Sequence, residues 1–384
     1  MVFQMVKDEA ASGLSPQEIQ KEFALRGLPD DFCLVPFSTL ILEPDGQVGS
    51  CRHKGSDFSV GSIMERSLLE IWNGPGLRSW RREFLKGEVQ TCKTETRHRA
   101  CHLCPRYNTL FPLVSPAEWQ SAPPLRLGLN LNGHCNLRCR MCHVWKKPNG
   151  LYSEPRYWSQ LEALLPHVRE VELLSGEPFV QKDTYRLIDL ISRINPACQW
   201  TITTNGHWKF NQRIEAALDK IPVKNLIVSL DSLNPQTYAL IRGGSLEVVL
   251  KNLELLVQYD RRRIQKSLSS LGLKINFLVQ KDNWAELAGF HEFGKAQKLE
   301  VFRTFLYEPL EFSLLSLSQS EREGILETYL ASLSGELLGH SMRILVPLID
   351  SLPKLAQCEY WLKLRNVAEH KKSIQALAFL APSV

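Results

Sequence analysis

From about residue 125 onwards, short apolar segments of strand length alternate with longer segments of helical hydrophobic periodicity. Strands that alternate with helices predict a parallel sheet with right-handed crossovers. Six such units would form three quarters of a (β/α)8 barrel, so we predict an α/β fold with a partial (β/α)6 barrel. The predicted strands are 125–131, 168–174, 199–204, 224–230, 272–279 and 299–306. The predicted helices include 182–194, 209–219, 246–259 and 283–296.

The segments before and after this alternation have other patterns. A proline-rich linker at 105–124 separates them from the barrel on its amino-terminal side. We therefore predict four domains. They are a helical appendage (1–31), a small module of a β-hairpin and helices (32–110), the partial barrel (120–310) and a helical region (311–384).

Local signals predict several element boundaries in the flanking segments. Ser15-Pro16-Gln17-Glu18 is a capping box with proline at the first helical position, and Ser318 with Glu321 forms a second box. Pro44-Asp45-Gly46 is a hairpin turn signal. Pro347 and Pro353 are expected to interrupt the carboxyl-terminal helices.

Three cysteines, Cys135, Cys139 and Cys142, follow the first predicted strand of the barrel within eight residues. Three thiolates can hold a cubane iron–sulfur cluster and leave its fourth iron open to a small molecule. The alternative is a zinc site, but structural zinc favours paired Cys-x2-Cys knuckles and four closed ligands. The spacing therefore favours an open iron–sulfur cluster.

Three further polar segments follow the next three strands: Ser175–Pro178, Thr203–Gly206 and Ser229–Asp231. Sites in parallel barrels lie at the carboxyl ends of the strands. We therefore expect these segments and the cysteine loop to line one pocket.

These segments resemble the radical S-adenosylmethionine (radical SAM) superfamily. The sequence CNLRCRMC (135–142) resembles its cluster loop, and LSGEP (174–178), TITTNG (201–206) and VSLDS (228–232) resemble later motifs in the same order. The helix pair in YALIRGGSLEVVLKNLELL also agrees. The resemblance implies that Cys135, Cys139 and Cys142 hold a [4Fe–4S] cluster whose open iron binds SAM. One electron would then cleave SAM to a 5′-deoxyadenosyl radical, which abstracts hydrogen from a substrate.

The resemblance also implies which residues contact SAM. Gly176 and Glu177 would meet the methionyl amine, and the family usually has glycine where Ser175 stands. Thr204 and Asn205 would meet the ribose or the carboxylate. The full set of expected cofactor-binding residues is Met141, Ser175, Gly176, Glu177, Thr204, Asn205 and Ser229. Met141 would shield the cluster and adenine, with core packing as its alternative, and Asp231 would either cap a helix or touch ligand.

A second set of cysteines lies in the module 32–110. Cys33, Gly46 and Cys51 resemble the signature of the twitch and SPASM auxiliary-cluster domains, although such domains usually follow the barrel. Cys101 and Cys104 would complete four metal ligands for a second [4Fe–4S] cluster, as in the shorter twitch form. Zinc stays an alternative because the Cys-x2-Cys pair suits it, and Cys92 is either a free thiol or a replacement for one of that pair. Cys198 and Cys358 are expected to be buried thiols.

Composition and charge limit the location and the partners of the protein only broadly. The 384 residues carry a net charge of +5, and no apolar run reaches the length of a membrane span. The amino terminus lacks the apolar region of a signal peptide, so we expect a cytoplasmic protein with no membrane partner. The basic segment Arg78–Gly87 is expected to be the solvated face of a helix with Trp80, Phe84 and Leu85 inward, and a nucleic-acid partner is not expected.

The resemblance predicts an enzyme, with a peptide or natural-product precursor as the favoured substrate class. The auxiliary cluster would accept an electron and make the net reaction an oxidation. An electron donor such as flavodoxin or ferredoxin would be a partner. Two alternatives stay open: a non-catalytic metal-binding scaffold protein and an RNA-modifying radical SAM enzyme.

Overall fold

The computed structural model describes residues 16–52, 58–92, 110–146 and 154–380. The chain divides into two compact units. The first, here called the barrel unit, is Asp31–Val89 with Leu113–Asn276; the second, the C-terminal unit, is Met1–Asp30, Gln90–Pro112 and Phe277–Val384. This division by contacts differs from the four domains predicted above, whose boundaries stay predictions.

The barrel unit contains a mostly parallel sheet. Its strand order is β3-β2-β1-β4-β5-β6-β7, followed by the first half of β8, and β4 to β8 pair in parallel. The strands are β1 (Thr39–Leu42), β2 (Gln47–Gly49), β3 (Gly61–Ser62), β4 (Arg126–Leu129), β5 (Glu170–Leu173), β6 (Gln199–Thr204), β7 (Val223–Ser229) and β8 (Leu273–Val279). The predicted α/β class is confirmed.

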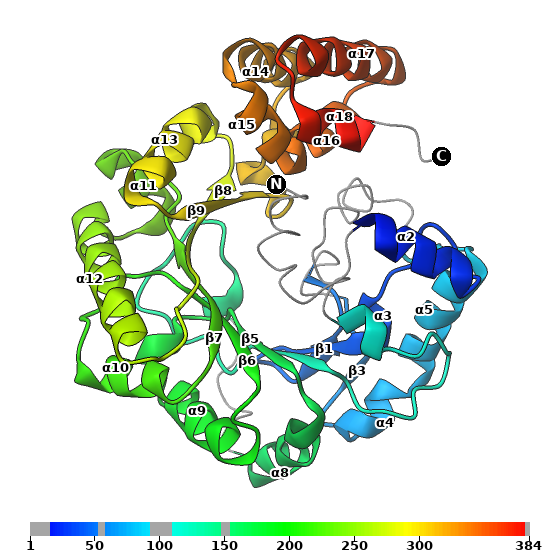
Figure 1. Ribbon diagram of the computed structural model, residues 1–384, viewed down its shortest axis with the longest axis vertical. Helices are drawn as coiled ribbons and strands as arrows, with labels where there is room; N and C mark the ends of the chain where they lie inside the picture. Colours follow the sequence, from blue (N-terminus) through cyan, green and yellow to red (C-terminus); the bar gives the residue numbers. More distant parts are fainter. Residues whose placement is uncertain (1–15, 53–57, 93–109, 147–153, 381–384) are drawn as a thin grey trace. The chain divides into compact units, whose positions relative to one another are not determined.

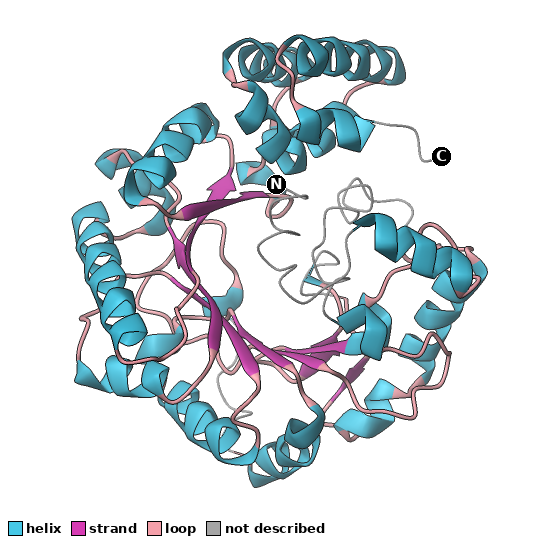
Figure 2. Cartoon of the chain, in the orientation of Figure 1, coloured by secondary structure: helices cyan, strands magenta, loops and turns pink. Residues whose placement is uncertain are grey.

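Helices of the barrel unit cover the apolar face of this sheet. They are α3 (Val35–Ser38), α4 (Leu68–Trp72), α5 (Pro75–Lys86), α8 (Pro155–Leu164), α9 (Lys182–Ile194), α10 (Gln212–Asp219), α11 (Pro235–Arg242) and α12 (Leu246–Gln265). Figures 1 and 2 show α8, α9, α10 and α12 outside the curved run of β4 to β7. In β5, Val171 and Leu173 are buried while Glu170 and Glu172 are half-buried, the alternation of a strand with one face against helices.

The hairpin of the amino-terminal module extends the barrel sheet. β1 and β2 pair antiparallel around the turn at Asp45 and Gly46, as the sequence predicted. β1 also pairs in parallel with β4, with Thr39 opposite Arg126. The module therefore supplies a fully buried strand to the sheet that positions the cysteine loop.

The first described helix of the C-terminal unit is α2 (Pro16–Leu25), whose Phe23 ring lies 5.3 Å from that of Phe111. In this unit β9 (Glu300–Phe305) follows the second half of β8 and packs against α13 and α16. Its helices after β8 are α13 (Leu287–Gln297), α14 (Gln319–Ser332), α15 (Gly335–His340), α16 (Met342–Asp350), α17 (Lys354–His370) and α18 (Ile374–Leu380). No helix in the described part of the chain is long and apolar enough to cross a membrane.

The capping box at Ser318 and Glu321 is confirmed, whereas two other predictions for this unit are wrong. Pro347 lies inside α16 instead of ending it, because burial of Val346, Leu348 and their neighbours outweighs the lost backbone bond. Cys358 is exposed, since it lies off the buried face of α17, which consists of Tyr360, Leu364 and Ala368.

Candidate active site

The three cysteines after β4 lie on one loop of the barrel unit. Cys139 is buried, and Cys135 and Cys142 are half-buried. Burial raises the pKa of the Cys135 and Cys142 thiols, and the charges of Cys139 and Cys142 raise that of Cys135 further. Met141 is buried beside these cysteines.

Each of the three sulfurs accepts hydrogen bonds from nitrogen. Cys135 Sγ accepts from the backbone of Leu137 at 3.5 Å and from Asn205 Nδ2 at 3.6 Å. Cys142 accepts from the backbone amides of Val144 and Trp145. Cys139 Sγ accepts from Arg242 Nη1 at 3.4 Å. Donors of this kind stabilise thiolates rather than thiols, so the donor set fits the anionic sulfurs of an iron–sulfur cluster.

The turn after β5 holds the start of the cysteine loop. Ser175 Oγ donates to the Asn132 carbonyl at 2.8 Å, and the backbone amide of Glu177 donates to the His134 carbonyl at 3.0 Å. Gly176 has a φ of 61°, and a Cβ there would lie 2.3 Å from the His134 oxygen. Only glycine fits this position, and Ser175 occupies the family's usual glycine position without needing a left-handed backbone.

Glu177 joins this turn to the end of β6. Its carboxylate is fully buried and accepts from Thr204 Oγ1 at 2.8 Å, from the Asn205 amide at 2.7 Å and from the Phe179 amide at 3.1 Å. Burial raises the pKa of Glu177 to about 7, although these hydrogen bonds act in the opposite direction. Asn205 then continues the chain of contacts to Cys135 Sγ. The motifs at 135, 177 and 204–205 thus form one hydrogen-bonded set.

The comparison with known families agrees with this arrangement. The model of the radical SAM superfamily matches residues 129–277, and the SPASM model, described as an iron–sulfur cluster-binding domain, matches residues 33–105. Residues 129–277 are thus a radical SAM domain, and residues 33–105 are a SPASM-type auxiliary-cluster domain. The two domains imply two [4Fe–4S] clusters and SAM as cofactors.

Curated relatives match this chain over part of its length. It is 29% identical over 171 residues to a probable GTP 3′,8-cyclase of Methanococcus vannielii, which covers 44% of this chain and 54% of the relative. It is 30% identical over 187 residues to the GTP 3′,8-cyclase of Xanthomonas campestris pv. campestris, covering 45% and 52%. The chain therefore spans about half the length of these curated relatives.

Two solved structures are similar at low sequence identity. Streptococcus suis SuiB bound to S-adenosylmethionine has 15% identity and a TM-score of 0.41, covering 78% of this chain and 68% of that one. Native anSMEcpe with bound AdoMet and the Cp18Cys peptide has 17% identity and a TM-score of 0.40, covering 54% and 58%. At these TM-scores the likenesses carry no functional argument.

The structure adds three residues that the sequence motifs did not point to as parts of the radical SAM site. Gln181 is buried, and its Nε2 donates to the carbonyls of Asn132, His134 and Ser175 at 3.2, 3.0 and 3.1 Å. Arg242 and Trp208 are the other two: Arg242 contacts Cys139, and Trp208 Nε1 donates to Thr204 Oγ1 at 2.8 Å. Arg242 lies within the YALIRGG segment that resembled the family's helix pair, whereas Gln181 and Trp208 lie outside the quoted motifs.

At the end of β7, the structure places Ser229 and Asp231, and it contradicts one of the two expectations for Asp231. Ser229 is the buried last residue of β7 and lies opposite Asn276 of β8. Asp231 caps no helix: its Oδ2 lies 2.7 Å from Arg242 Nε, and Asn234 is the residue that caps α11. The predicted capping alternative for Asp231 is therefore wrong, because its carboxylate is committed to a buried arginine.

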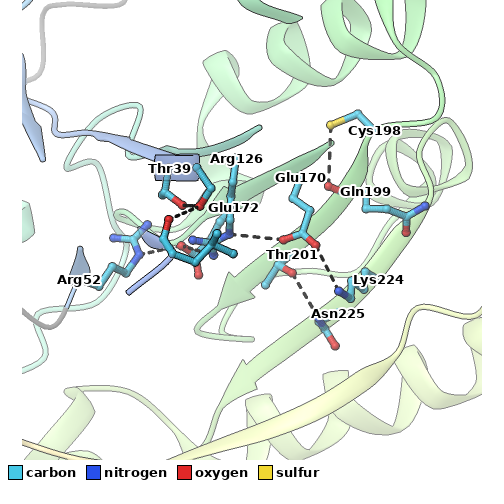
Figure 3. A network of polar contacts seen from close by, with 12 residues as sticks. Thr39, Arg52, Arg126, Glu170, Glu172, Cys198, Gln199, Thr201, Lys224 and Asn225 are labelled. Carbon is cyan, nitrogen blue, oxygen red and sulfur yellow. Dashed lines mark hydrogen bonds and ion pairs between the residues drawn. The ribbon is translucent and has the colours of Figure 1, made fainter. Parts of the chain in front are cut away.

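A polar network begins at the first residues of several strands (Figure 3). Thr39, Arg126, Glu170 and Gln199 are the first residues of β1, β4, β5 and β6. Arg126 lies 3.0 Å from Glu172, which also pairs with Arg52 at 2.8 Å. Arg52 Nη2 also donates to Asn130 Oδ1 at 3.2 Å, so the network extends along the strands to the residue that follows β4.

The auxiliary-cluster cysteines are only partly described. Cys33 and Cys51 are half-buried and form no disulfide with another described cysteine, and the same holds for Cys92. Ser50 Oγ donates to the Val35 carbonyl at 3.2 Å, which brings the chain beside Cys51 to the chain beside Cys33. Cys101 and Cys104 lie outside the described residues. Within the described residues, no three Cys, His, Asp or Glu side chains surround a point that fits a single metal ion.

The basic segment of α5 is not the fully solvated face that the sequence predicted. Trp80 and Phe84 are buried as expected and Leu85 is half-buried. Arg81, however, is fully buried, donates to the Pro36 carbonyl at 2.8 Å and stacks on Trp72. Arg78 and Arg82 both pair with Glu118.

Proposed function

We propose that this chain reductively cleaves S-adenosylmethionine and uses the resulting radical to modify an organic substrate. The observation that carries the proposal is the hydrogen-bonded set that joins Cys135, Glu177, Thr204 and Asn205. A scaffold that had lost catalysis would not need a buried carboxylate and an amide tied to the sulfur of an open three-cysteine loop.

Cys135, Cys139 and Cys142 would hold the SAM-binding cluster, which when bound supplies one electron to the SAM sulfonium. Around it, Gly176 and Ser175 shape the turn that fixes the loop. Met141 and Ser229 are the buried side chains that we assign to the adenosine and methionyl portions of SAM.

Glu177 is well suited to meet the methionyl ammonium. A carboxylate has about four acceptor positions, and its three hydrogen bonds use three of them. Burial raises the pKa of Glu177, because it disfavours the charged carboxylate. An ammonium group beside it would supply a compensating charge, while Thr204 and Asn205 hold the carboxylate in place.

Cys33, Cys51, Cys101 and Cys104 would hold the auxiliary cluster. We assign it the electron that is left after hydrogen abstraction, so that the net reaction is an oxidation. The family requires a reductant, and a flavodoxin or ferredoxin would be its source.

A peptide or natural-product precursor is our first candidate for the substrate. A nucleoside triphosphate is the second candidate, and the named GTP 3′,8-cyclases among the relatives favour it. The two classes are separated by adding GTP or a set of candidate peptides and following substrate-dependent consumption of SAM.

The test of SAM cleavage uses anaerobically iron-loaded protein with SAM and dithionite, and it measures 5′-deoxyadenosine. We expect product from the wild type, none from Cys139→Ala, and wild-type amounts from Cys358→Ala, which removes an exposed thiol of α17. Equal yields from the wild type and Cys139→Ala would overturn the proposal and return attention to a scaffold role.

A further inference from the structure

Arg242 connects one cysteine of the loop to a buried carboxylate. Its Nη1 donates to Cys139 Sγ at 3.4 Å, and its Nε lies 2.7 Å from Asp231 Oδ2. Arg242 is 8% exposed, Asp231 is fully buried and Cys139 is 6% exposed. Water therefore screens these charges little, and each acts strongly on the sulfur.

The position of Arg242 is fixed by the same loop that it contacts. Arg242 is the last residue of α11, which ends at Gly243 in the left-handed conformation with a φ of 71°. The backbone amide of Arg140 donates to the Ile241 carbonyl at 3.1 Å, so the cysteine loop is bonded to the end of this helix. The Arg242 contact with Cys139 is thus built into two bonded segments and does not depend on a flexible surface side chain.

We propose that Arg242, held in place by Asp231, sets the reduction potential of the SAM-binding cluster through its hydrogen bond to Cys139. This inference rests on the proposed function, in which Cys139 is a ligand of that cluster. Arg242 is a positioning and electrostatic residue here, and it takes no part in bond breaking.

The sign of the effect follows from charge. Reduction adds one negative charge to the cluster, and a cationic donor at a ligand sulfur stabilises the reduced form more than the oxidised form. Arg242 therefore makes the cluster easier to reduce. Asp231 partly cancels this effect, because its negative charge lies against the same guanidinium.

Substitutions of Arg242 and of Asp231 are therefore expected to shift the reduction potential in opposite directions. In Arg242→Gln the loss of the cation should lower the potential, favouring the oxidised cluster at least tenfold, which is 59 mV for one electron. In Asp231→Asn the arginine charge is no longer balanced, so the potential should rise and the reduced cluster should be favoured severalfold. A purely structural role would not reverse sign between two members of one ion pair.

The experiment is an anaerobic potentiometric titration of iron-loaded protein, followed by electron paramagnetic resonance of the reduced cluster. Arg138→Gln is the matched control, since Arg138 is an exposed cation of the same loop whose Nη1 donates to carbonyls and not to sulfur. We expect less than a twofold change in that variant. Arg242→Lys, which keeps the charge, should shift less than Arg242→Gln.

The outcomes separate this inference from the proposed function. Wild-type protein that loads no cluster would remove the proposed function itself. A loaded wild type that cleaves SAM, together with shifts below twofold or of the same sign in Arg242→Gln and Asp231→Asn, would overturn only the role of Arg242. If Arg242→Gln does not hold the cluster, the reduction potentials of Asp231→Asn and Arg242→Lys decide the question. A rise in Asp231→Asn together with a smaller shift in Arg242→Lys would support the role of Arg242, and any other result would overturn it.

Discussion

Glu177 shows how a single residue organises this site. Its carboxylate receives three hydrogen bonds from the β6 end and from its own turn, yet no described cation forms an ion pair with it at contact distance. Its proton is therefore held more tightly in the folded chain than in the unfolded one. A buried carboxyl with a pKa of about 7 makes the stability of the cluster-free protein depend on pH.

The first prediction concerns that dependence. Between pH 4.5 and about 7 the folded chain binds more protons at Glu177 than the unfolded chain, so the free energy of unfolding should fall as pH rises. The loss should be about 3 kcal/mol by pH 8. Urea denaturation of the wild type and of Glu177→Gln at several pH values gives the two free energies of unfolding, and their difference at each pH measures the contribution of Glu177. The exposed Glu254→Gln is the control, and a pH-independent difference for Glu177→Gln would contradict the assignment.

Gly176 supports a second prediction at this scale. An alanine there would have to keep a φ of 61° and place its Cβ 2.3 Å from the His134 oxygen and 2.4 Å from Gln181 Nε2. Gly176→Ala should lower the free energy of unfolding by more than about 1 kcal/mol and reduce the iron content after reconstitution. Gly324→Ala in α14 is the matched control, because nothing lies within 4 Å of its added Cβ. There we expect a gain of about 0.5–1 kcal/mol; equal effects in both variants would rule out the steric argument.

At the scale of elements, the bounds of helices and strands were predicted best where the hydrophobic periodicity was clear. The helix predicted at 182–194 has these bounds in the structure, because Leu187, Ile188 and Ile191 repeat on one buried face. The strand ends were also placed within a few residues, which brought the motifs together at one edge of the sheet. Gln181 and Arg242 had no such signal, since Asn132 lies 49 residues from Gln181 and Cys139 lies 103 residues from Arg242, and only the folded sheet brings these pairs together.

We therefore predict that Gln181 stabilises the connection between β5 and α9. Its amide ties three carbonyls of two separate segments, and Gln181→Met would leave these buried acceptors with fewer donors. We expect a loss of about 1–3 kcal/mol in the free energy of unfolding and a slower return of iron after removal by chelator. Gln236→Met, at an exposed position of α11, should change neither quantity. Unchanged iron uptake in Gln181→Met would show that the cysteine loop keeps its conformation without this amide.

At the scale of the whole molecule, the order of the two domains along the chain has a structural consequence. The module with Cys33 and Cys51 precedes the barrel, and its β1 pairs in parallel with β4, the strand that leads into the cysteine loop. Residues 41 and 128 even pack closely enough that a Cβ at Gly128 would lie 3.1 Å from Ile41 Cγ1. The sequence predicted a hairpin in this module but could not show which strand it would join, because strand pairing between distant segments has no local signal.

The last prediction follows from this pairing. A fragment of residues 113–384 should be insoluble or unstable, because loss of β1 leaves the backbone of β4 as an unpaired and largely apolar edge. Coexpression of residues 1–112 as a separate chain should restore soluble protein, since it returns β1 to that edge. Hydrogen exchange of the β4 amides is the measurement, with protection expected in the intact chain and in the reassembled pair. A soluble fragment 113–384 with fully protected β4 amides would mean that the barrel strands close without the module, and that β1 serves only to place Cys33 and Cys51.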